Sequence, residues 1–134
     1  MFYLLKNLIN TNMQLSNKKK VAVSISIFLG ILSGVLSHTY RPYIYKNHIY
    51  DYHFADTISS WLSIPAASLL CWGIQRNNTY NYPQFIAISL IAFSYFELFL
   101  GITFDYYDLV ALYLSALITY LFYLLLKMIR FDKK

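Results

Sequence analysis

Lysine and arginine, which occur 11 times in the 134 residues, are confined to short segments between long runs that lack them. These runs are apolar and predict helical spans at about 21–38, 57–75, 84–104 and 108–128. Helices of this size are roughly 26–32 Å long, which matches a hydrocarbon core of about 30 Å. The pattern therefore predicts an all-α membrane protein, a four-transmembrane-helix bundle.

Composition excludes the other broad classes. Hydrophobic residues make up 58% of the chain and charged residues 13%, whereas soluble domains have about 45–50% and about 25%. A soluble domain of this size needs more polar side chains to cover its surface. The aromatic content of 19% excludes disorder, and the single cysteine, Cys71, excludes a disulfide scaffold.

The basic residues predict the orientation in the membrane. Four spans put both termini on one side, and that side carries nine basic residues: Lys6, Lys18, Lys19, Lys20, Arg76, Lys127, Arg130, Lys133 and Lys134. The other side carries only Arg41 and Lys46. Since basic loops stay in the cytoplasm, we expect both termini to be cytoplasmic. The net charge of +5 is then a topology signal, and no nucleic-acid partner is predicted.

These spans divide the chain into three parts. Residues 1–20 form a cytoplasmic N-terminal segment, whose first ten residues fit a short interfacial helix and whose residues 10–17 fit a polar connector. Residues 21–129 form one transmembrane domain, and 130–134 form a basic cytoplasmic tail. The alternative is a cleaved signal peptide that starts at Lys18–Lys20, but three further spans follow and favour a retained first span.

Helix packing and helix ends give further expectations. Ser26, Gly30 and Gly34 recur every fourth residue, so they share one helix face on which another helix can approach closely. Residues 38–56 are tyrosine-rich and predict a loop against the outer leaflet. Asp56 and Asp108 stand just before their apolar segments, where they are expected to act as N-caps.

Glu97 is the acidic residue inside a predicted span, seven residues before its outer end. A carboxylate at that depth is costly unless it is paired, so such residues face the bundle interior or water. The candidate partners from the sequence are His38 and Arg41, and failing those, serine or tyrosine hydroxyls. Glu97 is either a ligand-binding or proton-active carboxylate, or a buried tie that fixes helix packing.

Five further candidate ligand-binding residues are predicted at the outer surface, in addition to Glu97. They are Asp56, Asp105, Asp108, Arg41 and His53. Histidine and aspartate are metal ligands, but their spacing around His53 fits no specific metal motif, so no metal and no cofactor is predicted. The sequence also contains no GxSxG, HExxH or glycine-rich phosphate loop. A catalytic role is therefore open, and a non-enzymatic role is favoured.

Residues 95–115 resemble the VanZ-like family of small membrane proteins. An acidic residue near the end of the third helix (Glu97), a tight turn, and an aspartate that opens the fourth helix (Asp108) follow the family pattern. The chain departs from the family pattern at four positions. Leu100 stands where the family usually has a glutamine, and Ile102 stands in the neighbourhood of its usual arginine. Leu112 and Ser115 stand where the family usually has an asparagine and a glycine.

The resemblance implies a multi-pass protein of the bacterial cytoplasmic membrane, connected with the cell envelope and with glycopeptide resistance. On this hypothesis the outer carboxylates engage a lipid-linked or glycan ligand, and membrane lipid is the predicted partner. Two alternatives stay open. One is an accessory subunit with protein partners in the membrane or in a homo-oligomer, and the other is a small proton-coupled carrier or membrane enzyme.

Overall fold

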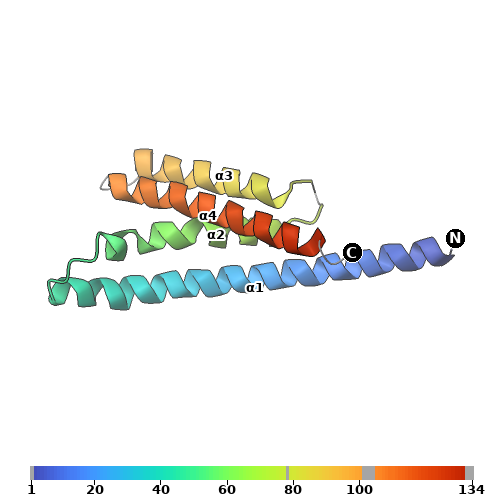
Figure 1. The fold of residues 1–134 in the computed structure, drawn as a ribbon, viewed down its shortest axis with the longest axis horizontal. Helices are drawn as coiled ribbons and strands as arrows, with labels where there is room; N and C mark the ends of the chain where they lie inside the picture. Colours follow the sequence, from blue (N-terminus) through green and yellow to red (C-terminus); the bar gives the residue numbers. More distant parts are fainter. Residues whose placement is uncertain (1, 78, 101–104, 132–134) are drawn as a thin grey trace.

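Four long helices make up the described part of the chain (Figure 1). The computed structural model describes residues 2–77, 79–100 and 105–131, without the side chains of 2–15, 130 and 131. The elements are α1 (Phe2–Lys46), α2 (Phe54–Ile74), α3 (Tyr82–Tyr95), the π-helical turn η1 (Phe96–Leu100) and α4 (Tyr106–Phe131). Four helical segments are long and apolar enough to cross a membrane. The predicted fold class is confirmed.

Helix α1 is longer than the sequence pattern suggested. The polar connector predicted at 10–17 is wrong, and the loop predicted from residue 38 begins only after Lys46, because one helix runs through both regions. No proline or glycine occurs between residues 2 and 29, and the Asn, Thr, Ser and Lys residues there each cost at most about 0.7 kcal/mol in a helix. At 1.5 Å per residue, α1 is about 67 Å long, roughly twice a hydrocarbon core.

The start of α1 and the end of α4 lie toward the same end of the bundle, with the N-terminal part of α1 projecting past the other helices (Figure 1). Helix α2 packs against each of α1, α3 and α4. The core between α2, α3 and α4 consists of Ile64, Ile86, Leu112 and Ala116, with partly buried apolar side chains around it. Helix α2 is therefore the central element of the domain.

Serine hydroxyls connect α2 to its neighbours. The Ser26 hydroxyl of α1 donates to the Ala66 carbonyl oxygen at 2.7 Å, and the Ser115 hydroxyl of α4 donates to the Trp61 carbonyl oxygen at 2.6 Å. Ser26 and Ser115 are both buried. Small side chains that bond to a facing backbone let membrane helices approach closely and satisfy their own polar atoms.

The outward surface of the helices is apolar. Phe28, Ile91 and Phe99 are 63%, 70% and 69% exposed. In water this exposure would be costly, at about 25 cal/mol per Å² of apolar surface. Lipid tails are as apolar as these side chains, so the exposed surface is the one expected of a multi-pass membrane protein.

The glycines differ in what surrounds them. A Cβ atom added to Gly73 on α2 would lie 2.5 Å from the Val23 side chain and 3.1 Å from the Lys19 carbonyl oxygen, both on α1. A Cβ added to Gly30 or Gly34 would meet no other atom of the described chain within 4 Å. The helices α1 and α2 therefore depend on Gly73 for their closest approach, while Gly30 and Gly34 face away from the packed interior.

We expect Gly73→Ala to lower the free energy of unfolding by about 1–3 kcal/mol, because the added methyl group overlaps α1. Gly30→Ala is the matched control. It adds the same group to a helix where there is space, and should leave stability unchanged or raise it by about 0.5–1 kcal/mol. Thermal unfolding of both variants in detergent distinguishes the two effects. Equal stability of the two variants would contradict the close α1–α2 contact.

Candidate functional site

The C-terminal end of α1, the N-terminal ends of α2 and α4, and turn η1 meet at one end of the bundle (Figure 1). We call this region the acidic end. It carries all six ligand-binding candidates from the sequence: Arg41, His53, Asp56, Glu97, Asp105 and Asp108. The fold therefore brings together residues that are up to 67 positions apart in the chain.

Asp56 is the centre of one polar network. Arg41 Nη2 lies 3.2 Å from Asp56 Oδ1, and the Tyr45 hydroxyl donates to the same oxygen. Arg41 also donates through Nε to the Tyr45 hydroxyl oxygen at 3.4 Å. Because Arg41 and Tyr45 lie one helical turn apart on α1, both reach the first turn of α2. The ion pair therefore joins the end of α1 to the start of α2.

His53 extends this network to α4. Its Nδ1 atom lies 3.7 Å from Asp56 Oδ2, and its ring stacks on Tyr107 with centroids 4.3 Å apart and planes at 11°. His53 occupies the N-cap position of α2 with φ of 63°. Left-handed backbone is uncommon outside glycine, and histidine is one of the residues that tolerate it. This backbone conformation aims the imidazole at the first turn of α4.

The predicted N-caps Asp56 and Asp108 are wrong. Both helices begin earlier than predicted, so these aspartates lie within the first turn. Asp51 and Asp105 take the capping role: each accepts a hydrogen bond from a backbone N–H of its helix start, at 2.7 Å and 2.9 Å. The first-turn aspartates are left free for contacts between helices, and they still interact favourably with the helix dipole.

Asp108 makes such a contact. The Ser60 hydroxyl of α2 donates to Asp108 Oδ1 at 2.7 Å. Ser60 is buried, and Asp56 lies one turn before it on the same helix face. Two carboxylates therefore lie at the first two turns of α2: Asp56, which belongs to α2, and Asp108, which belongs to α4.

Glu97 lies in turn η1 and is partly buried. Among the described residues it has no hydrogen bond or ion pair, since Arg41 pairs with Asp56 and His38 is exposed on α1. Its charged neighbours are Asp105 and Asp108, which carry the same sign. Neither of the candidate partners named from the sequence, Arg41 or His38, pairs with Glu97 within the described residues.

Ser94 adds an unused polar group near Glu97. Its hydroxyl is buried and has no partner among the described residues. It lies three residues before Glu97, one turn deeper in the same span. A buried hydroxyl without a partner costs about 1–3 kcal/mol.

Three residues of the acidic end were missed by the sequence analysis: Tyr45, Ser60 and Tyr107. Two of them had a spacing signal, because Tyr45 follows Arg41 by four residues and Ser60 follows Asp56 by four. The stacking of His53 on Tyr107 had no spacing signal in the sequence, since it joins the starts of two helices that are far apart in the chain.

An apolar groove adjoins the acidic end between α1 and α2. It has a volume of about 320 Å³ and is lined by Leu32, Leu36, Tyr40, Phe54, Ile58, Trp61 and Leu62. Tyr40 directly precedes Arg41, and Phe54 and Ile58 flank Asp56 in the sequence. The same two helices therefore present charged side chains at their ends and an apolar surface directly below.

The described residues contain no group of three or more histidine, cysteine, aspartate or glutamate side chains arranged to hold a metal ion. The side chains at the acidic end offer carboxylates, hydroxyls, imidazole rings, the Arg41 guanidinium and the Lys46 ammonium. These groups bind polar ligands through hydrogen bonds and charge.

No protein-family model, curated protein or solved structure matches the chain.

We expect Ser60 and Asp108 to be energetically coupled. In a double-mutant cycle of Ser60→Ala and Asp108→Ala, the coupling energy should be about 1 kcal/mol, as for other hydrogen bonds between membrane helices. The measurement is reversible unfolding in mixed micelles. Ser59→Ala replaces the preceding, exposed serine, and its coupling to Asp108→Ala should be close to zero. A similar coupling for both serines would contradict a specific α2–α4 contact.

Proposed function

We propose that this multi-pass membrane protein binds a lipid-linked ligand, with a polar headgroup at the acidic end and an apolar chain in the adjoining groove. The observation that carries the proposal is the 320 Å³ groove, whose lining residues Tyr40, Phe54 and Ile58 lie within two positions of Arg41 or Asp56 in the sequence. Ligand sites are commonly apolar clefts with a few polar groups at fixed positions. A lipid-linked molecule has both parts.

The charges at the acidic end favour a headgroup that donates hydrogen bonds. Five carboxylates lie in this region, Asp51, Asp56, Glu97, Asp105 and Asp108, against the two basic residues Arg41 and Lys46. Arg41 is already engaged by Asp56. Sugar hydroxyls or amino groups would be bound by Glu97, Asp105 and Asp108, since Asp51 caps α2, whereas a phosphate would be repelled. The headgroup is therefore a glycan or another hydroxyl- or amine-bearing group.

The cellular setting is also a proposal. It combines the resemblance of residues 95–115 to the VanZ-like family with the nine basic residues on the side of the termini. On this basis the protein lies in the bacterial cytoplasmic membrane with its termini in the cytoplasm, and the acidic end faces outward. The proposed role in the cell envelope rests on the resemblance to the VanZ-like family, which is associated with glycopeptide resistance.

Glu97→Gln tests the proposal, because it keeps the size of the side chain and removes its charge. Charge-assisted hydrogen bonds contribute about 1.5–3 kcal/mol, so ligand occupancy should fall by about tenfold or more. Occupancy is measured by native mass spectrometry of the protein extracted gently from its own membrane. The mass of the retained molecule also identifies the class of ligand.

Asp51→Asn is the matched control for Glu97→Gln. It removes one carboxylate from the same end, but Asp51 caps α2 and is not one of the candidate ligand contacts. Occupancy should be retained in this variant. An extracted protein that carries no lipid-linked or glycan adduct, or that keeps it in Glu97→Gln, would overturn the proposal.

The second candidate function is that of an accessory subunit in a larger membrane assembly. It is favoured by the outward face of α1, where Gly30 and Gly34 meet no other atom of the described chain. The spacing of these glycines, with three residues between them, is typical of faces on which a second membrane helix packs.

If α1 is such an interface, replacing both glycines by leucine (Gly30→Leu with Gly34→Leu) should abolish a stoichiometric complex and leave the single chain folded. Leucine blocks close approach of a partner helix, yet both positions have space within the chain. Native mass spectrometry reports the stoichiometry, and Ile31→Leu, which keeps the size of an exposed neighbour, is the control. A wild-type protein that is monomeric in its extracted form would exclude this function.

A further inference from the structure

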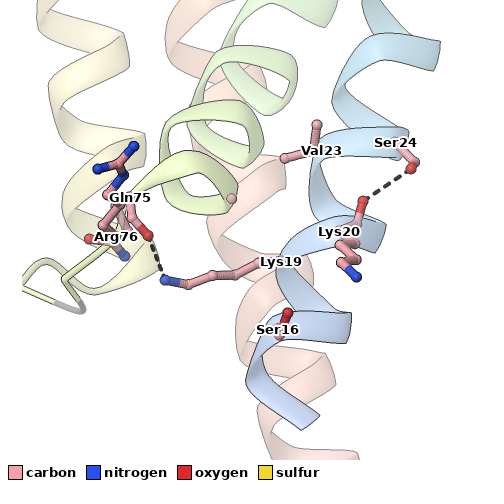
Figure 2. Close-up of a pocket in the computed structure, with 8 residues that line it drawn as sticks. Ser16, Lys19, Lys20, Val23, Ser24, Gln75 and Arg76 are labelled. Atoms are coloured by element: carbon pink, nitrogen blue, oxygen red, sulfur yellow. Dashed lines mark hydrogen bonds between the residues drawn. The ribbon is translucent and has the colours of Figure 1, made fainter. Parts of the chain in front are cut away.

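A second pocket lies at the opposite end of the bundle, between α1 and the last turn of α2 (Figure 2). Its volume is about 610 Å³, within the range of about 300–1,000 Å³ typical of ligand sites. Three cationic side chains line it, together with two serine hydroxyls: Lys19, Lys20 and Arg76, with Ser16 and Ser24. We call it the basic pocket.

One of the three cations builds the pocket wall. Lys19 Nζ donates to the carbonyl oxygen of Gln75, the C-cap residue of α2, at 2.7 Å (Figure 2). A lysine at this place satisfies a terminal carbonyl and interacts favourably with the helix dipole. Gly73, which also lines the pocket, holds the same turn against α1. The α1–α2 contact therefore fixes the shape of the basic pocket.

The other two cations are available to a ligand. Lys20 and Arg76 are exposed, and neither forms an ion pair within the described residues. They lie on opposite sides of the Lys19 side chain in Figure 2. The carboxylates of the described residues belong to the acidic end, so none of them lies beside these cations. The pocket thus carries positive charge on both sides of Lys19 (Figure 2).

The depth of the pocket matches the membrane surface. It lies where α2 ends at Ile74 and where the apolar part of α1 begins at Val21. Beyond it on α1, apolar side chains face outward, including Val21 at 57% and Phe28 at 63% exposure. Basic pockets between membrane helices at this depth bind anionic headgroups, and the apolar helix surface beside them accommodates acyl chains.

We propose that the basic pocket binds a phosphate group through Lys20 and Arg76, with Lys19 beside it. The phosphate comes either from the headgroup of an anionic phospholipid or from a small soluble molecule, since both offer the same oxygens to the guanidinium and ammonium groups. This site is independent of the ligand proposed for the acidic end, because it lies at the other end of the bundle and has the opposite charge.

Titration of the full chain in a non-ionic detergent tests the proposal. The probes are phosphatidylglycerol, phosphatidylcholine with the same acyl chains, and inorganic phosphate, and the readouts are the thermal midpoint and lipid adducts in native mass spectrometry. Phosphatidylglycerol should bind more tightly than phosphatidylcholine. The double variant Lys20→Gln with Arg76→Gln should lose roughly 10- to 30-fold in affinity, as expected for two basic contacts with an anionic lipid.

A control variant with Lys18→Gln and Lys127→Gln also removes two positive charges from this end, but neither residue lines the pocket. Its affinity should change by less than about threefold, because exposed charges outside the pocket are screened. Preference for phosphatidylglycerol alone identifies a lipid headgroup, and an equal effect of inorganic phosphate identifies a soluble ligand. Equal losses in the two double variants, an unchanged pocket variant, or no response to either anion would overturn the proposal.

Discussion

The structure depends on the packing of α2, which contacts all three other helices. In a membrane there is no gain from burying apolar side chains, because lipid is as apolar as they are, so close approach and hydrogen bonds must hold helices together. Helix α2 uses both. It offers Gly73 to α1, backbone carbonyls to Ser26 and Ser115, and the Ser60 hydroxyl to Asp108.

This packing also separates charge along the bundle. The described carboxylates lie where α2 begins, and the cluster of Lys19, Lys20 and Arg76 lies where it ends. Each end has a cavity between α1 and α2, one apolar beside carboxylates and one lined by cations. One pair of helices therefore carries two cavities of different chemical character, one at each end of the bundle.

The spans and the gathering of Arg41, Asp56 and Asp108 at one end were predictable, since both follow from where charges interrupt apolar sequence. The position at which α1 ends was not predictable, because tyrosine, histidine and Pro42 are typical of loops and yet occur inside this helix. The capping residues were also missed. Local sequence places a cap only to within a few residues, and the choice of Asp51 over Asp56 depends on where the chain turns into α2. The partner of Asp56 depends on tertiary contacts that spacing does not encode.

The continuous course of α1 has a mechanical consequence. A single helix cannot both cross the bilayer and lie flat on its surface, because the change of direction would break its backbone hydrogen bonds. The 17 residues from Phe2 to Lys18 therefore extend about 25 Å along the axis of the first span. Any tilt of α1 within the membrane would be amplified at its N-terminus, as with a lever arm. A rotation of α1 about its contact with α2 at Gly73 would therefore displace the first turns of α1 further than it displaces Lys19.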